Sequence, residues 1–291
     1  MLKRLPILCT ALFALAACGH STDSSTPASS SAPTAAPAAS APATAAPAPA
    51  STAVAHPAPA SSAPTSAATT AAAPAAPAKA PPFVEDPKWV EGKNYFRIEP
   101  TQPKVSNTDK IEVAEVFSYA CPSCNAFHPM VDQLAKSLPS DAVMAYLPVS
   151  FMPQENFPMF QRAFLTAQAL GVADKANDAM YDAVWKSKEL SSERADGQGL
   201  KPMSELPTLA DAAKFYAKYG ADPKEFLAVA NSFSINTQVK RADELVKAYG
   251  VEGTPTIVID GKYRIDLRAA GGYAQMVELT RYLVAKEAAG K

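Results

Sequence analysis

The stretch FSYACPSCNAFHP, residues 117–129, holds two of the four cysteines in the chain. Three chemistries use two thiols at this spacing: metal binding, haem attachment and thiol–disulfide exchange. Haem attachment requires a histidine directly after the second cysteine, and this chain has Asn125 there. A structural zinc site needs four ligands, usually from two such pairs, and the sequence has no second pair. Thiol–disulfide exchange is therefore the favoured interpretation.

The pattern around the cysteines supports this chemistry. A buried strand is predicted over residues 111–119, and a helix is predicted from Pro122 to about residue 137. This order places Cys121 at the helix N-terminus, where unpaired N–H groups and the helix dipole stabilise a thiolate and lower its pKa. Cys124 lies about one turn further in. We predict that it is less exposed and that it resolves a mixed disulfide formed on Cys121.

His128 follows Cys124 by four residues, so a helix places both side chains on one face. A three-ligand metal site is conceivable there. Isolated histidines, however, are more often partly buried or solvated, and we predict no metal site and no organic cofactor. We instead hypothesise that His128 tunes Cys124 electrostatically.

A second feature lies far away in the sequence. In the stretch VEGTPT, residues 251–256, Pro255 stands at the head of a predicted buried strand, where it removes a ladder hydrogen bond. A cis bond in a tight approach explains such a proline. A trans proline that ends the preceding helix is the alternative. Together with the cysteine pair, the sequence favours the cis bond.

The N-terminus predicts export. Basic residues at positions 3 and 4 precede a short apolar run, which ends in LAACG at positions 15–19. This stretch resembles the lipobox of bacterial lipoproteins, which implies a signal peptide over 1–17 and an acylated Cys18. The alternative is an ordinary secretory signal whose cleavage site happens to lie beside a cysteine. In either case, the protein is exported. If Cys9 leaves with the signal peptide and Cys18 carries lipid, only Cys121 and Cys124 remain as thiols.

Residues 18–82 are predicted to form a disordered linker rich in Ala, Pro, Ser and Thr, because residues 24–78 contain no Asp, Glu, Lys or Arg and prolines recur throughout. Aromatic residues, charges and periodic patterns begin at about residue 83, which predicts one domain over 83–291. Removal of Lys3 and Arg4 with the signal peptide takes the formal net charge from −1 to −3, which argues weakly against a nucleic-acid partner.

The domain is predicted to be mixed α/β. Residues 154–249 are mostly helical by pattern, with helix caps at Thr208 and Asp222. Asp260 and Gly261 predict a tight hairpin between the last two strands. The remaining predicted elements are strands over 95–98, 143–149, 256–259 and 263–265, and a closing helix over 274–288.

The chain resembles the DsbA family of periplasmic thiol:disulfide oxidoreductases over roughly residues 94–288. The similar stretches are EVFSYACPSCNAF, VSFMP, GVADKANDAMYDAVW and GVEGTPTIVIDGKYRI. The resemblance implies a thioredoxin-like α/β fold with an inserted all-helical domain at about 154–249. It also implies an enzyme that introduces disulfide bonds into exported polypeptides.

The resemblance further implies roles for individual residues. Cys121 is expected to be the nucleophile and Cys124 the resolving thiol. Pro255 and Thr254 are expected to pack against the disulfide and bind extended substrate backbone, and Glu115 to influence proton transfer at the cysteines. An apolar substrate groove is expected near Pro255 and residues Pro122, Ser123, Phe151 and Met152.

The implied partners are reduced or unfolded exported polypeptides and a quinone-linked membrane oxidase of the DsbB type. The expected location is the periplasm, with the acylated Cys18 as the anchor in one of the two membranes.

Two departures from the family concern charge. Ser123 stands where family members often have histidine, and Tyr146 where they often have lysine. Thr254 also resembles the residue that precedes the cis-proline in some reductase or isomerase relatives. The direction of electron flow therefore stays open, and a reductase or isomerase is the alternative enzyme. A non-catalytic lipoprotein with a binding role is the alternative from another class.

Overall fold

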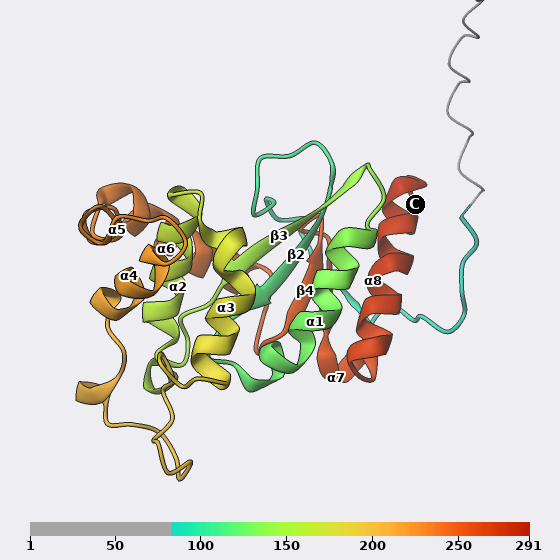
Figure 1. Ribbon diagram of the computed structural model, residues 1–291. Coiled ribbons are helices and arrows are strands. Elements are labelled where there is room, and N and C mark those ends of the chain that lie inside the picture. The colour runs from blue at the N-terminus through green and yellow to red at the C-terminus, as the bar shows by residue number, and fades with distance from the viewer. Residues whose placement is uncertain (1–82) are drawn as a thin grey trace, which may run out of the picture. The chain divides into compact units, whose positions relative to one another are not determined.

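Five strands form one mixed sheet with the order β1-β5-β4-β2-β3 (Figure 1). The computed structural model describes residues 83–291, so the predicted signal peptide, Cys18 and the linker lie outside the described residues. Strands β2 and β3 are parallel, and the other neighbouring pairs are antiparallel. The strands are β1 (Phe96–Arg97), β2 (Ile111–Phe117), β3 (Ala142–Pro148), β4 (Thr256–Ile259) and β5 (Tyr263–Asp266).

The helices form two groups around this sheet. In Figure 1, α1 and α8 lie side by side across one face of the sheet, and α2 to α6 gather beyond β3. The helices are α1 (Pro122–Ser137), α2 (Phe157–Ala169), α3 (Ala173–Trp185), α4 (Leu209–Ala217), α5 (Pro223–Ala230), α6 (Phe233–Ala248), α7 (Leu267–Ala270) and α8 (Tyr273–Ala288), with short 3-10 helices η1 (Pro153–Glu155) and η2 (Met203–Glu205).

The strand β2 lies between β4 and β3 and leads directly to the cysteines. Six of its seven residues are buried, and these include two glutamates, Glu112 and Glu115. One apolar core lies between the sheet, α1 and α8, and a second joins the sheet to α2–α6. Both cysteines belong to the second core. The active-site turn is therefore held by packing from both parts of the fold.

The predicted thioredoxin-like fold with a helical insertion is confirmed. The hydroxyl of Thr208 and the carboxylate of Asp222 cap α4 and α5, and Asp260 and Gly261 form the hairpin turn with positive φ angles of 51° and 65°. Residues 154–249 are mostly helical, as predicted, but residues 186–208 within this region are not helical apart from η2. An isolated antiparallel β-bridge pairs Glu193 with Leu200 within this segment.

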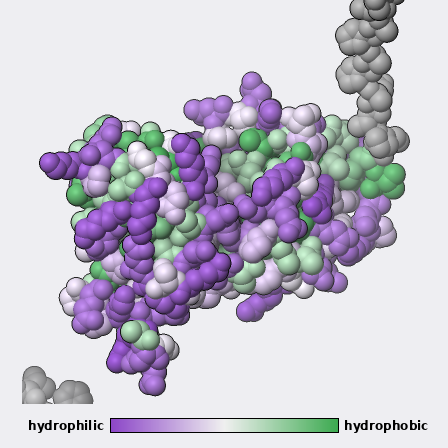
Figure 2. Space-filling view, viewed as in Figure 1, coloured by the Kyte–Doolittle hydropathy of each residue, from purple (hydrophilic) through white to green (hydrophobic). Residues whose placement is uncertain are grey.

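The view in Figure 2 shows a face covered mainly by hydrophilic side chains, with smaller apolar areas between them. Among the residues that the structure describes, no helix has both the length and the apolar character needed to cross a membrane.

Candidate active site

Cys121 is the N-cap residue of α1, and Pro122 occupies the first helical position. Proline fits there because the first helical N–H has no partner within the helix. The Cys121 Sγ atom accepts a hydrogen bond from the backbone N–H of Cys124 at 3.4 Å. Both cysteines are free thiols, with 6% and 0% of their surface exposed. The structure thus shows the reduced dithiol, with its outer thiol at the helix dipole.

The two thiols differ strongly in acidity. The pKa of Cys121 is lowered to about 6, first by a hydrogen bond from the Cys124 thiol, against the opposing effect of burial. Thr254 and the backbone N–H groups of Cys124 and Ser123 lower this pKa further. The pKa of Cys124 is raised well above its ordinary value, mainly by burial and then by the neighbouring Cys121. At neutral pH, Cys121 is therefore the thiolate and Cys124 the proton-carrying partner.

The proline loop comes to the dithiol from the other end of the domain. The Thr254–Pro255 peptide bond is cis, and β4 begins at the next residue. The carbonyl oxygen of Thr254 lies 3.4 Å from the Cys121 Sγ atom. Because β4 pairs with β2, the sheet brings together two motifs separated by more than 130 positions in the sequence.

Glu115 lies on β2 behind the dithiol, with 1% of its surface exposed. It stands opposite Tyr146 on β3 and Ile257 on β4. One carboxyl oxygen, Oε1, has no hydrogen-bond partner. Burial, followed by the charges of Cys121 and Asp132, raises the pKa of Glu115 to about 8. The carboxyl group is therefore protonated at neutral pH and holds a proton near the cysteines.

A Glu115→Gln variant is expected to change how stability depends on pH. The native Glu115 keeps its proton up to about pH 8, whereas the unfolded chain loses it near the ordinary value of 4.5. The free energy of unfolding of the wild type therefore falls as pH rises between these values. Relative to the wild type, the variant should gain on the order of 3 kcal/mol between pH 5 and pH 9. Urea unfolding of the reduced protein at pH 5, 7 and 9 measures this difference.

Glu112, on the same strand, provides the matched contrast. Its carboxylate accepts hydrogen bonds from the N–H groups of Val105 and Ser106, both at 2.7 Å, and from the Ser106 hydroxyl. Glu112→Gln should therefore destabilise the protein at all three pH values, because the amide replaces one of the accepting oxygens with a donor. Parallel pH profiles for the wild type and Glu115→Gln would contradict the proposed protonation of Glu115.

The predicted groove residues lie on two segments. Pro122 is exposed and Ser123 half-buried at the start of α1. Phe151 and Met152 follow β3, and Phe151 is 40% exposed and contacts Phe157 with ring centroids 5.9 Å apart. The expectation that these residues bind substrate stays a prediction.

A pocket beside Pro122 was not foreseen from the sequence. Its volume is about 140 Å³, and α3 and the segment after it supply most of its lining, including Trp185 and Glu193. The indole N–H of Trp185 donates a 2.8 Å hydrogen bond to the carbonyl oxygen of Tyr119, two residues before Cys121. The segment that lines this pocket is the non-helical part of the region that the sequence pattern predicts to be mostly helical.

His128 lies on α1, one turn beyond Cys124, and is buried. Its Nε2 atom lies 2.8 Å from Oδ1 of Asp178 on α3, and its ring stacks on Tyr181 with centroids 4.3 Å apart. The imidazole is thus engaged with α3, and the hypothesis that it tunes Cys124 remains a prediction.

A family model described as a DSBA-like thioredoxin domain matches residues 112–283. The chain is 35% identical over 201 residues to the thiol:disulfide interchange protein DsbA of Pseudomonas aeruginosa, covering 69% of this chain and 87% of that protein. It is also 35% identical to DsbA of Azotobacter vinelandii, covering 67% of this chain and 83% of that protein.

Solved structures agree with the sequence matches. The crystal structure of Pseudomonas aeruginosa DsbA matches with a TM-score of 0.59 and 34% identity, covering 70% of this chain and 96% of that one. The oxidoreductase DsbA from Xylella fastidiosa matches with a TM-score of 0.60 and 28% identity, covering 69% and 98%.

Proposed function

Because the chain belongs to the DsbA-like thioredoxin family and is a thiol:disulfide oxidoreductase, we propose that it works in the oxidising direction and introduces disulfide bonds into exported polypeptides. A substrate thiolate attacks Sγ of Cys121 in the oxidised dithiol, the S–S bond breaks, and Cys124 leaves and takes up a proton. The second substrate thiolate then attacks the substrate sulfur of the mixed disulfide. The substrate disulfide forms, Cys121 leaves as a thiolate, and two electrons have passed to the enzyme.

The observation that carries this direction is the low pKa of Cys121. A thiolate with a pKa of about 6 is a good leaving group in the second step. It also stabilises the reduced protein at pH 7 by about 1.4 kcal/mol relative to a thiol of ordinary pKa. For a two-electron couple, this corresponds to a reduction potential about 30 mV higher. This contribution favours reduction of the enzyme by substrate.

The other site residues have supporting roles in this proposal. Thr254 and Pro255 hold extended substrate backbone beside Cys121, supported by the 3.4 Å approach of the Thr254 carbonyl to its sulfur. Glu115 supplies or accepts the proton that Cys124 exchanges, supported by its raised pKa behind the dithiol. Substrate side chains rest on the apolar groove residues Pro122, Ser123, Phe151 and Met152.

The proposed catalytic cycle requires an oxidant for the reduced dithiol and a compartment in which exported polypeptides are present. Curated relatives carry the name thiol:disulfide interchange protein DsbA, which supports reoxidation of the reduced dithiol by a quinone-linked membrane oxidase of the DsbB type. It also supports a periplasmic location. The proposed acylation of Cys18 would anchor the enzyme to a membrane, with residues 18–82 as a tether that leaves the domain free to meet unfolded substrates.

The redox equilibrium of the full chain against glutathione buffers tests the direction. Reference potentials of other proteins run from about −120 mV for DsbA, the type member of this family, to about −270 mV for thioredoxin. We expect a potential closer to −120 mV, because the Cys121 thiolate stabilises the reduced form. A potential near −270 mV would contradict the oxidase and assign the chain to the reducing direction.

The second candidate, a reductase or isomerase, is favoured by specific residues. The hydroxyl of Ser123 can donate a hydrogen bond but brings no positive charge to the thiolate, and Tyr146 stands beside Glu115 where a lysine would supply one. Both differences lower the potential relative to family members that carry these charges. Such an enzyme would need a membrane electron donor to keep its dithiol reduced.

A Ser123→His variant should restore part of the missing charge. An imidazolium beside Cys121 is expected to lower the pKa of this thiol by about one unit and raise the potential at pH 7 by about 30 mV. Thiolate absorbance against pH and the glutathione equilibrium measure the two effects. Ser123→Asn, polar but uncharged, is the control. An equal shift in both variants would show that positive charge is not the cause.

A further inference from the structure

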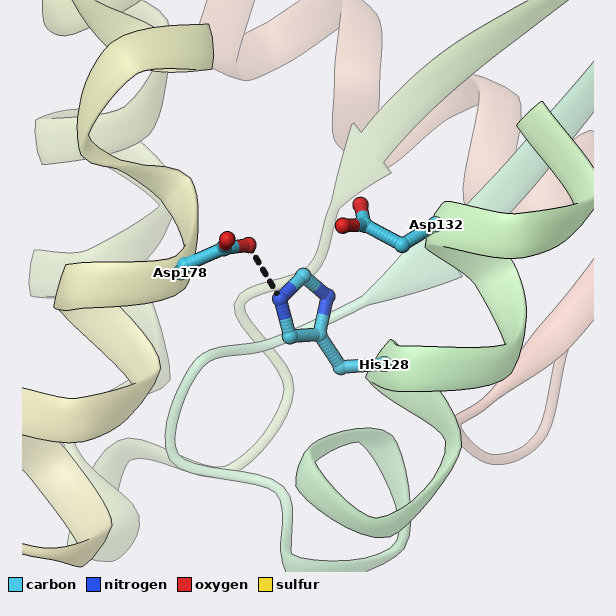
Figure 3. A group of neighbouring side chains, drawn as sticks. All are labelled: His128, Asp132 and Asp178. Carbon is cyan, nitrogen blue, oxygen red and sulfur yellow. Dashed lines mark hydrogen bonds and ion pairs between the residues drawn. The ribbon is translucent and has the colours of Figure 1, made fainter. Parts of the chain in front are cut away.

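Three side chains at the junction of α1 and α3, those of His128, Asp132 and Asp178, take no direct part in thiol–disulfide exchange. Figure 3 shows His128 and Asp132 projecting from α1 toward Asp178 on α3. The Nε2 atom of His128 lies 2.8 Å from Oδ1 of Asp178. One ligand atom from each residue lies within 4.8 Å of the other two. The three groups thus face one another across the junction of the thioredoxin core and the helical insertion.

The helix α1 presents its two donors in a fixed arrangement. His128 and Asp132 are four residues apart, so they stand one above the other on a single face of the helix. Stacking on Tyr181, with ring centroids 4.3 Å apart, holds the His128 ring. Only 11% of the His128 side chain is exposed, whereas the Asp178 side chain is 78% exposed. The imidazole is therefore pre-oriented, and a carboxylate at the mouth gives access from solvent.

The surroundings favour a cation independently of these three residues. The cleft beside them has a volume of about 780 Å³ and is lined by three carboxylates, those of Asp132, Asp174 and Asp178, against one ammonium group, that of Lys136. Lys136 lies 3.6 Å from Asp132, and its own side chain is 78% exposed. The charges of the three aspartates also raise the pKa of Tyr146, after the larger effects of burial and Glu115. The cleft thus carries excess negative charge in a partly apolar setting.

We propose that His128, Asp132 and Asp178 bind a divalent transition-metal ion, with Zn²⁺ the best match, and that this ion joins α1 to α3. One imidazole and two carboxylates are a zinc donor set, with water completing four-coordination. Tetrahedral ligand distances of about 2.0–2.1 Å place donor atoms about 3.3 Å apart. Rotation of the exposed Asp178 and the half-buried Asp132 side chains supplies the small closure that this geometry requires.

The imidazole distinguishes this ion from hard cations. Mg²⁺ and Ca²⁺ prefer oxygen ligands, whereas imidazole suits zinc, copper and nickel. The ion takes no direct part in the dithiol reaction, and its link to that site is the charge of Asp132, which contributes to the raised pKa of Glu115. Its expected effect is on the junction of the two parts of the fold, because an ion that binds the folded protein alone raises its stability.

The test uses the full chain with all four cysteines replaced by serine, because thiolates would otherwise compete for the metal. Titration calorimetry with Zn²⁺ should show one equivalent bound. Asp178→Asn and His128→Asn should each weaken this binding by roughly tenfold or more. Asp182→Asn, one turn further along α3, and His56→Asn, outside the described residues, are matched controls that should bind as tightly as the parent. Co²⁺ absorption in the visible region should report imidazole ligation in the parent and lose this signature in His128→Asn.

Thermal unfolding gives a second readout. Zn²⁺ should raise the unfolding temperature of the parent and of both control variants, but not that of Asp178→Asn. Because the Asp178 side chain is exposed, this variant decides the question even if His128→Asn folds poorly. Equal Zn²⁺ affinity in the parent and Asp178→Asn would overturn the proposal. So would Mg²⁺ binding as tight as that of Zn²⁺ and unaffected by His128→Asn, which would leave only a general attraction to acidic groups.

Discussion

A Cys121→Ser variant is expected to lose thiol–disulfide exchange by more than about 10³-fold. The reason is that Cys121 supplies the sulfur that substrates attack and the thiolate that leaves. Serine keeps the N-cap hydrogen bond to the N–H of Cys124 but cannot form a disulfide. Oxidation of a reduced, unfolded substrate protein, followed by its recovered activity, measures the loss.

A matched cysteine control isolates this effect. Cys18→Ser removes a thiol outside the described residues and should leave exchange in solution unchanged. The unfolding transition of Cys121→Ser should stay close to that of the reduced wild type, so that loss of activity is not loss of fold. Substantial exchange by Cys121→Ser would contradict the assigned nucleophile and favour a binding role for the domain.

A Cys124→Ser variant is expected to accumulate the mixed disulfide between Cys121 and its substrate. Its Cys121 thiolate attacks a disulfide-bonded peptide, but no neighbouring thiol is present to resolve the mixed disulfide. In the wild type, this resolution is intramolecular and correspondingly fast, so the adduct should persist longer by more than about 10³-fold in the variant. Non-reducing electrophoresis and intact mass measure the accumulated adduct.

Cys124→Ala separates the two roles of the inner thiol. A hydrogen bond from the Cys124 thiol is the largest cause of the low pKa of Cys121. Serine preserves a donor at this position, whereas alanine removes it. At pH 6–7, adduct formation should therefore be slower in Cys124→Ala than in Cys124→Ser. Equal rates would show that the N-cap N–H and the helix dipole suffice to hold the thiolate.

Much of the fold is predictable because its signals are local. Pro122 starts α1, and Asp260 and Gly261 form a tight turn, because their own backbone geometry favours these conformations. The apolar residues of β2 indicate a strand that is buried in the sheet. The cis bond before Pro255 follows from two signals taken together, a proline at the head of a buried strand and the distant cysteine pair. The structure also has a cis bond before Pro100, which no neighbouring motif indicated.

What escaped prediction depends on long-range packing. The segment 186–208 carries residues compatible with helix, but it packs against η1, where the Ser192 hydroxyl donates a 2.9 Å hydrogen bond to the carbonyl oxygen of Glu155. Similarly, His128 and Asp178 stand 50 positions apart, and only the packing of α3 against α1 brings them within 2.8 Å. Spacing along the sequence identifies groups that share one helix, but not the partner that a second helix supplies.

The helix α1 carries the dithiol in its first turn and His128 and Asp132 in later turns of the same face. Each residue added to a helix rotates everything beyond it by about 100°. A one-residue insertion between Cys124 and His128 would therefore turn the imidazole away from Asp178, and would turn the buried Val131 and Leu134 with it. In evolutionary terms, point substitutions can change the dithiol or the His128 group independently. An insertion or deletion between Cys124 and His128 instead shifts every later residue of α1 at once.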